Sequence, residues 1–326
     1  AFSPKDFKAW IIEEATTGTI PTITSGLLQL DVDSVSMPSL NVNQNLTPKT
    51  SVGRVLHAND FFQDSTVRAT EVSLSGTYHN DTGHIMLMQS ACGVALAATV
   101  ADVAIPTAST TVAGKYGVTE GDKTFTLVLA APDTTDGYNI VMPGCLCTNF
   151  AISAEAGSDG GLYKWSATIS SGQKPTTNNT ATEAGTVYSA APISLHTCTS
   201  ATTVNSIAST VLSGFSVTID SPAVYQGFSA TGYAAYARAP ELSVMATAQV
   251  KYDSVTRPIL NNFNTQTAHD AADMLTLTQD TATDCSIAIG SGVLTNVALS
   301  ESDIMLLDIE IKAVNVGNNI ITFDLA

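Results

Sequence analysis

Apolar and polar residues alternate with a period of two in several short stretches of the chain. The alternation is clearest at 28–32, 72–75, 124–129, 150–153, 215–220 and 309–312. Successive side chains of a β-strand point to opposite faces, so this period is typical of strands with one buried face. Clusters of Gly, Pro, Asn and Asp separate the stretches, as strand boundaries require. The sequence therefore predicts a mainly β protein.

Helical patterns are few. The best covers Thr82 to Ala91, where Ile85, Met88 and Gln89 fall on one side of a helix, and a counterpart follows Thr256. We therefore expect short helices beside the sheets rather than a helical domain.

The two halves of the chain resemble each other in order, which suggests an internal repeat. Four matches carry it: Leu28–Asp33 with Phe215–Asp220; Tyr78, Thr82 and Ile85 with Tyr252, Thr256 and Ile259; 125–128 with 275–278; and Thr148–Ser153 with Thr295–Ser300. The alternative is that strands rich in Thr, Ser and Val align with one another by composition alone.

The repeat predicts a division of the chain into two β domains. They cover 27–170 and 211–326, after an N-terminal arm at 1–26, and a Thr- and Ser-rich linker or surface excursion at 171–210 joins them. The first half carries extra residues at about 41–65 and about 94–118, which we interpret as long loops inserted into a shared core.

Charge is scarce and unbalanced. The 326 residues include 13 basic and 29 acidic ones, giving a net charge of −16. Charged residues make up 13% of the chain, against about 25% in typical soluble domains. Such a surface favours contact with other copies of the chain, since interface cores are depleted in charge. The acidity argues against a protein that grips nucleic acid, which needs Lys and Arg against the phosphates.

Residues that carry chemistry form no recognisable constellation. The five cysteines have no regular spacing, and Cys145 and Cys147 would share one strand face as core thiols or, with further ligands, as half of a metal site. His79 and His84 are interpreted as surface or packing residues. Asp31 and Asp33 favour a solvated strand face over half of a cation site. No nucleotide-binding or hydrolase motif occurs, so we expect no enzyme, cofactor or metal.

Targeting signals are also missing from the printed sequence. No stretch of 18 apolar residues exists, so we expect no membrane insertion, and residues 1–10 do not resemble a signal peptide.

The N-terminal region carries a family resemblance. The stretch from Trp10 through Glu14 and Gly18 to Pro21 resembles the opening of the major tail-tube proteins of long-tailed, siphovirus-like bacteriophages, where a phrase Glu-x-Thr-x-Gly-Thr-x-Pro precedes the first core strand. A long polar loop, the phrase Thr70–Tyr78, a short helix and the phrase Gly137–Gly144 follow in the order typical of that family. The resemblance is strongest over about 10–170.

The resemblance implies a β-sandwich or split barrel with one flanking helix, and with the internal repeat this predicts tandem β-sandwich or split-barrel domains, each with a short flanking helix. It implies a structural virion protein whose copies form rings, stacked into a tube through which DNA leaves. The expected partners are other copies of the chain and the tail-tip, tape-measure and terminator proteins, with DNA passing without specific binding. The expected location is the virion tail, after assembly in the host cytoplasm. A secreted adhesin or S-layer module and a capsid decoration protein are the alternatives.

Two groups of residues are the candidate sites. The inserted loop mixes apolar and polar residues as interface loops do, and we expect it to contact the next ring; its candidates are Arg54, Val55, Leu56, Asp60, Phe61 and Phe62. A lumen that lets DNA pass should be acidic or neutral, and the candidates for its wall are Asp31, Asp33 and Asp220.

Overall fold

The structure, a computed structural model, is mainly β with two α-helices among the described residues. It describes residues 3–23, 25–38, 43–46, 61–64, 70–94, 96, 103–105, 124–132, 139–178, 185–197, 202–208, 212–226, 235–238, 242–265, 274–278, 285–300, 304–314 and 319–325. The sheets do not close on themselves, and the fold is of the β-sandwich kind that the sequence predicted.

The elements of the first half and of the connecting region follow the chain in this order. They are η1 Pro4–Asp6, β1 Lys8–Glu13, β2 Leu27–Leu30, β3 Ser34–Val35, β4 Asn43–Leu46, β5 Phe61–Asp64, β6 Thr70–Thr77, α1 Thr82–Cys92, β7 Val103–Ile105, β8 Phe125–Ala130, β9 Asn139–Glu155, η3 Asp159–Gly161, β10 Lys164–Ser171, β11 Thr176–Asn178, β12 Gly185–Thr186 and η4 Leu195–Thr197.

The second half repeats the same mixture of strands and one helix. Its elements are β13 Thr203–Val204, β14 Ile207–Ala208, β15 Leu212–Asp220, β16 Ala223–Gln226, β17 Ala235–Arg238, β18 Ser243–Lys251, α2 Arg257–Asn264, β19 Leu275–Leu277, β20 Ser286–Ile289, β21 Gly292–Ser300, β22 Leu306–Ala313 and β23 Ile321–Asp324.

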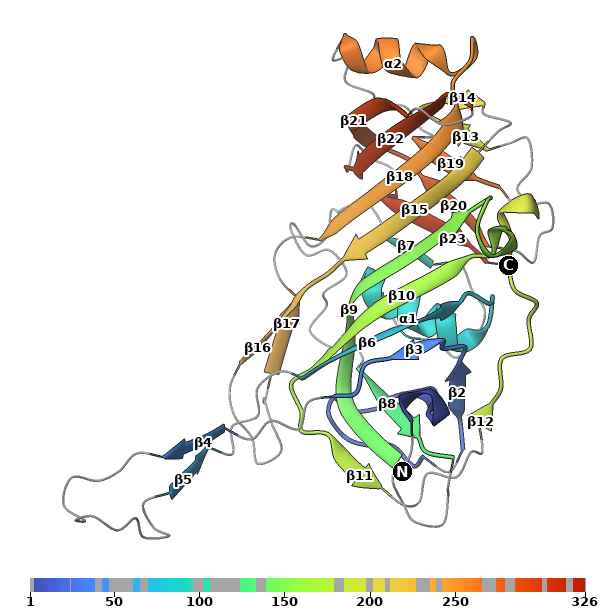
Figure 1. The fold of residues 1–326 in the computed structure, drawn as a ribbon. Coiled ribbons are helices and arrows are strands. Elements are labelled where there is room, and N and C mark those ends of the chain that lie inside the picture. Colours follow the sequence, from blue (N-terminus) through green and yellow to red (C-terminus); the bar gives the residue numbers. More distant parts are fainter. Residues whose placement is uncertain are drawn as a thin grey trace.

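One long antiparallel sheet runs through both halves (Figure 1). Its order is β3-β6-β10-β9-β15-β18-β22-β21, so each half contributes four strands. The halves meet where β9 pairs with β15, from Asn149 opposite Asp220 to Glu155 opposite Gly214. The two groups of four have the same pairing order, β3-β6-β10-β9 and β15-β18-β22-β21.

A second layer of strands lies behind each half of the long sheet. In the first half the order is β12-β2-β1-β8-β9-β11, because β9 is long enough to serve both layers. In the second half it is β14-β13-β19-β20-β23-β7. Strand β7 comes from the first half and pairs with β23, so residues of the second insertion bind the two halves together.

Local sequence explains the elements that the alternation predicted. In β6, Val72 and Leu74 are buried while Glu71 and Ser73 are exposed. Helix α1 ends at Gly93, whose φ of 66° is left-handed and whose N–H bonds back to the Ser90 carbonyl; glycine accepts this conformation without strain. Strand β8 differs from the pattern, because all six of its residues are buried. It lies between two apolar clusters, so its alternation does not mark an exposed face.

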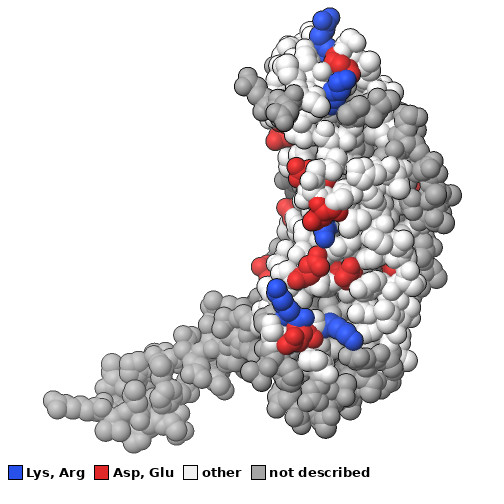
Figure 2. Space-filling model, turned by 45° about the vertical axis from the view of Figure 1, so that its right-hand side comes forward, with Lys and Arg blue, Asp and Glu red and all other residues white. Residues whose placement is uncertain are grey.

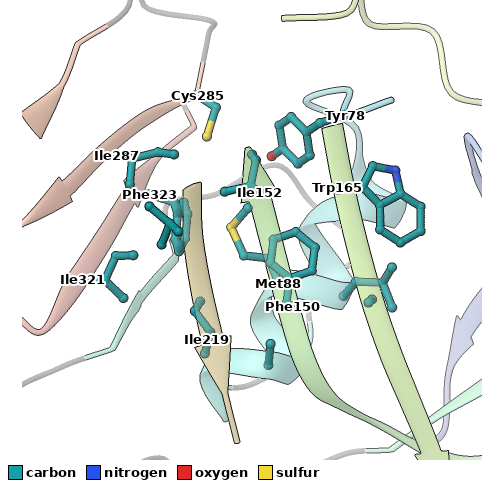
Figure 3. Packing of buried hydrophobic residues seen from close by; sticks show 14 of the residues in the cluster. Tyr78, Met88, Phe150, Ile152, Trp165, Ile219, Cys285, Ile287, Ile321 and Phe323 are labelled. Carbon is teal, nitrogen blue, oxygen red and sulfur yellow. The ribbon is translucent and has the colours of Figure 1, made fainter. Parts of the chain in front are cut away.

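One apolar core joins the two halves. Figure 3 shows Met88 of α1 and Ile152 of β9 beside Ile287 and Phe323 from β20 and β23, and all four belong to one cluster of buried side chains. The core therefore fixes how the two groups of strands lie relative to each other.

The pairing order corrects one of the sequence matches. Residues Leu27–Leu30 form β2, which pairs with β1 in the second layer, whereas Leu212–Asp220 form β15 in the long sheet. Leu28–Asp33 and Phe215–Asp220 thus occupy different places, and β3 is the strand with the place of β15. Their similar alternation reflects strand structure, not equivalent position.

Candidate functional site

The long sheet has two unpaired edges in the part of the chain that the structure describes. Strand β3 pairs only with β6 at one end, and β21 pairs only with β22 at the other. The second layers also end in strands that have one partner each, β12 and β11 in the first half and β14 and β7 in the second, but these strands are two or three residues long, whereas β21 has nine residues. Unpaired edges present rows of backbone donors and acceptors that another chain can bind. Assembly is therefore favoured along the long sheet.

Large apolar side chains are exposed at the β21 end. Leu299 is 45% and Val293 40% exposed on β21, and Ile304 and Met305, in the connection to β22, are 59% and 47% exposed. Several exposed apolar residues gathered at one edge mark a binding surface, whereas single ones do not.

The contact between β9 and β15 shows how such an edge is covered inside one chain. Helix α1 packs against β9 and β15 beneath this junction, and all its residues from Gly83 to Cys92 are buried. Helix α2 packs in the same way against β21, yet Ile259 is its only fully buried residue. Strand β21 and helix α2 of the second half thus correspond to β9 and α1 of the first. Among the described residues, however, no strand in the place of β15 pairs with β21 and covers α2.

A bulge marks the corresponding place in β9 and β21. Thr148 is the extra residue between Cys147 and Asn149 opposite β10, and its hydroxyl donates to the Thr168 carbonyl at 3.2 Å. Thr295 is the extra residue opposite β22, and its hydroxyl donates to the Glu310 carbonyl at 3.3 Å. These are the threonines that begin the fourth sequence match.

Arg238 fastens the intrachain junction beside the first of these bulges. Its guanidinium donates to the carbonyls of Cys147 at 2.7 Å, Ser221 at 2.8 Å and Ser90 at 2.5 Å, so it joins β9, β15 and the end of α1. Burial raises the pKa of the Cys147 thiol to about 12, although the Arg238 charge opposes the shift. The thiol therefore stays neutral, and Arg238 binds carbonyls rather than a thiolate.

Glu14 holds together two phrases that carry the family resemblance. This buried carboxylate accepts bonds from the N–H of Gly18 at 2.7 Å, the N–H of Gly144 at 2.8 Å and the hydroxyl of Thr126 at 2.6 Å, and it also accepts from the Thr124 hydroxyl. Gly18 and Gly144 both have left-handed φ angles. The N-terminal phrase and the phrase ending at Gly144 thus form one structural unit around a carboxylate that is itself buried.

The outer face of the long sheet is covered mainly by small polar side chains. Its described charged residues are the acidic Asp33, Glu71, Glu155, Asp220, Asp308 and Glu310 and the basic Lys164, Lys251 and Lys312. Acidic residues therefore outnumber basic ones on this face by six to three. Figure 2 shows charged side chains running in one band along the molecule, beside an uncharged surface. A hollow of about 500 Å³ on this face is lined in part by Glu155, Asp308 and Glu310.

The three acidic residues proposed for a lumen wall lie in two environments. Asp33 and Asp220 are exposed on the outer face, and Lys164 lies 3.4 Å from Asp33. Asp31 lies in the bend between β2 and β3, where its carboxylate contacts Nε2 of His79 at 2.9 Å and accepts from the Tyr188 hydroxyl. Asp31 and Asp33 do not share a strand face, because both lie in the connection between β2, which ends at Leu30, and β3, which begins at Ser34.

The two histidines near α1 are packing residues, as the sequence indicated. His84 is buried, and burial lowers its pKa to about 3. Its neutral ring accepts the Asp31 N–H at 3.3 Å. His79 donates from Nδ1 to the Ala190 carbonyl at 2.8 Å and so attaches the 185–197 segment to the first half. Among the described residues, no group of three potential metal ligands occurs.

Most residues of the predicted ring-to-ring loop fall outside the described part of the chain. These are Arg54, Val55, Leu56 and Asp60. Phe61 and Phe62 begin β5, which pairs with β4 from Leu46 opposite Phe61. In Figure 1 the β4–β5 hairpin stands well away from the sheets. The second half carries the β16–β17 hairpin between the corresponding strands, β15 and β18.

Two residues with structural roles were not singled out from the sequence. Glu14 belongs to the family phrase, but the sequence analysis assigned no role to it. The signal that could have identified it was Gly18, which follows it in the same phrase and binds it in the structure. Arg238 had a signal in the repeat: Arg238-Ala-Pro-Glu-Leu-Ser-Val244 resembles Arg68-Ala-Thr-Glu-Val-Ser-Leu74. That match has a different offset along the chain from the four matches of the repeat, so it was not recognised with them.

No helix in the described part of the chain is long and apolar enough to cross a membrane. A comparison with curated proteins found no match. A comparison with protein families found that the family described as phage tail tube protein matches residues 8–313, from the start of β1 to the end of β22. Together with the β-sandwich fold, this match shows that the chain belongs to the phage tail tube protein family.

Proposed function

We propose that the chain is a structural, non-enzymatic virion protein whose copies join edge to edge into rings, and that stacked rings form a tail tube through which DNA leaves. The observation that supports this best is that the long sheet has two unpaired edges among the described residues, at β3 and at β21. Strand β21 has the place of β9, and β3 has the place of β15. Because β9 and β15 pair inside the chain, β21 and β3 of successive copies have the geometry to pair between chains.

The ring that follows from this arrangement contains three chains. The contact joins two different surfaces, and repeated contacts of this kind close into a ring when the rotation permits. We propose that each chain carries two copies of one tube domain, within 27–170 and 211–326. The strand pairing indicates that each copy begins earlier in the chain than these bounds. Strand β1 pairs with β8 in the first copy as β13 pairs with β19 in the second. Three chains thus supply six domains.

The outer face of the long sheet is our candidate for the lumen wall. Its uncharged side chains are mainly short Ser and Thr, and its acidic surplus includes Asp33 and Asp220. DNA carries about one negative charge per 1.7 Å of axis, so such a wall repels it and permits passage without specific binding. Asp31 is a weaker candidate, because it contacts His79 and Tyr188.

We propose that the loop carrying β4 and β5 makes the contact between successive rings. The β4–β5 hairpin stands away from the sheets in Figure 1. The other partners that we propose are the tail-tip, tape-measure and terminator proteins. Assembly would take place in the host cytoplasm, and the product would be the virion tail.

Electron microscopy of purified protein tests the proposal. At high concentration and moderate salt, with tail tips as seeds, the wild type should form hollow tubes. A variant in which a short Gly-Ser turn replaces residues 41–65 should keep the wild-type circular dichroism spectrum and form rings that do not stack. A wild type that stays monomeric when seeded would contradict the function. Normal tubes from the deletion variant would contradict only the role of the loop.

A further inference from the structure

We propose that Met305 of one chain enters a hollow between η1 and β3 of the next chain in the ring, and that η1 of that next chain packs beside Ile304. The partner is a second copy of the chain, and its N-terminal residues form part of the contact. The proposed ring brings these two surfaces together, so the inference rests on the proposed function.

Two apolar side chains project beside the β21 edge. Ile304 is 59% and Met305 is 47% exposed, and both lie immediately before β22. Exposed large apolar side chains that lie together at an unpaired sheet edge indicate a surface that another chain covers. The intrachain junction between β9 and β15 shows how the corresponding surface of the first half is covered.

Tyr163 has the place of Met305 in the first half. The Tyr78 N–H, just before α1, bonds to the Tyr163 carbonyl at 2.8 Å. The Tyr252 N–H, a few residues before α2, bonds in the same way to the Met305 carbonyl at 2.9 Å. The registers of β6 with β10 and of β18 with β22 agree with this correspondence. Tyr163 is fully buried, and its ring lies edge to face with that of Phe215 in β15, at 5.0 Å between centroids.

The next chain presents Val35 in the place of Phe215. Val35 of β3 lies opposite Leu74 in β6, and Phe215 of β15 lies opposite Ala248 in β18. Leu74 and Ala248 each lie four residues before the tyrosine whose N–H defines the correspondence above. When β3 takes the place of β15 in the ring, Val35 therefore faces Met305 of the preceding chain.

A hollow of about 230 Å³ lies beside Val35. It is lined by η1 and the start of β3, and its apolar side chains are those of Phe7, Val32 and Val35. All three are only half-buried in the single chain, although they pack against the core. Methionine is unbranched and flexible, so it fills irregular apolar gaps. Met305 is thus a side chain suited to this hollow.

The connecting region shows where η1 belongs in the same contact. Helix η4 precedes β13 as η1 precedes β1, and these two strands have corresponding partners, β19 and β8. Each short helix follows a serine whose carbonyl accepts an N–H from the last helical residue. Ser3 accepts from Asp6 at 2.9 Å, and Ser194 accepts from Thr197 at 3.1 Å. Ser3 and Ser194 therefore have corresponding places.

The position of Ser194 predicts that of Ser3 in the ring. Ser194 forms an isolated β-bridge with Leu162, which directly precedes the buried tyrosine. Ile304 directly precedes Met305 in the same way, so Ser3 of the next chain is placed beside Ile304. Ser3 also lines the hollow proposed to receive Met305. The β3 edge and the N-terminal residues thus lead independently to one contact.

Assembly of Met305 variants tests the contact. Met305→Asp should raise the critical concentration for tube formation about 10- to 100-fold, because it replaces a buried apolar side chain by an unpaired charge. Met305→Leu keeps an apolar side chain of similar volume and should assemble at nearly the wild-type concentration.

Met245→Asp is the matched control for the charge. Met245 is 43% exposed on β18, which pairs with β15 on one side and β22 on the other, so it lies away from both unpaired edges. This variant should assemble like the wild type. Circular dichroism and thermal unfolding of each monomer should match the wild type, because all the replaced side chains are exposed in the single chain.

A reconstruction of wild-type tubes supplies the second measurement. The Met305 side chain should lie within about 4.5 Å of Val35 in the adjacent chain of the same ring, with η1 of that chain beside Ile304. Tubes in which Met305 lies elsewhere, or an unchanged critical concentration in Met305→Asp, would overturn this inference and leave the tube function intact. A wild type that forms no tubes would instead refute the proposed function on which it rests.

Discussion

Replacing Leu299 by lysine is expected to leave the chain folded and to prevent it from forming tubes. Leu299 lies on β21 at the unpaired edge and is 45% exposed in the single chain. In the ring it takes the place of Ile152 in β9, which is fully buried where β9 pairs with β15. In the monomer a lysine at this position is exposed to water. In the ring it would bring an unpaired charge into the junction between two chains.

The expected size of this effect follows from the side chain that is lost. Full burial of a leucine is worth about 1.5–3 kcal/mol, and the charge adds a desolvation cost, so the critical concentration should rise at least about 10-fold. Val187→Lys is the matched control: Val187 is 56% exposed and lies after β12, away from both edges of the long sheet. Sedimentation of assembled protein and circular dichroism of the monomer give the two readouts. Normal tubes from Leu299→Lys would show that β21 is not the joining edge.

Replacing Glu14 by alanine should have the largest effect on the stability of the single chain. The change leaves the N–H groups of Gly18 and Gly144 and the hydroxyls of Thr124 and Thr126 without their buried acceptor. Each unpaired buried donor costs about 1–3 kcal/mol, so the free energy of unfolding should fall by roughly 4 kcal/mol or more. Since domains are typically stable by about 5–15 kcal/mol, the variant should be close to unfolding at room temperature.

Chemical denaturation measures this loss directly. Glu71→Ala, at an exposed position on β6, removes the same charge and should change the free energy of unfolding by less than about 0.5 kcal/mol. If Glu14→Ala unfolds at the same denaturant concentration as the wild type, Glu14 does not hold the two phrases together.

The sequence identified elements whose signal is local. Alternation located β6 because Val72 and Leu74 face the core while Glu71 and Ser73 face water. Helix α1 was placed within a residue of its observed end, where Gly93 supplies a left-handed cap. Both signals arise from the period of one element and need no knowledge of its partners.

What the sequence could not specify depends on partners far along the chain. The alternation in β8 indicated an exposed face, but Thr126 on that strand binds Glu14 inside the protein. Residues 94–118 were expected to be an inserted loop, yet β7 within them pairs with β23 near the C-terminus. The match of Leu28–Asp33 with Phe215–Asp220 failed because strands of the same period look alike wherever they pair.

The candidate site was predicted unevenly for the same reason. An acidic strand face was expected, and Asp33 and Asp220 do lie on the outer face of the long sheet, but the bend after Leu30 turns Asp31 toward His79. The unpaired edges at β3 and β21 had no sequence signal, because an edge is defined by the absence of a neighbour in the folded sheet. The pairing order of the strands in the structure identified these edges.

Disulfide trapping across the joining edges tests the central claim most directly. Ser216 faces Ser153 in the intrachain junction, and Ser36 and Ser300 have the corresponding places in β3 and β21. The bonds from Ser221 to Thr148 and from Ala156 to Ser213 make this a non-hydrogen-bonded pair. Its Cα atoms would lie about 4.5 Å apart, which permits a disulfide. The four described cysteines are buried and form no disulfide with one another, and Cys198 can be replaced by serine.

Tubes of the Ser36→Cys, Ser300→Cys variant should be oxidised and then resolved by denaturing electrophoresis without reductant. Rings of three chains predict a ladder of one, two and three linked chains that ends at three. The off-register pair Met37→Cys, Ser300→Cys should link poorly. A ladder that continues to six chains would contradict the tandem arrangement, and tubes that do not link through Ser36 and Ser300 would contradict the joining of β3 to β21.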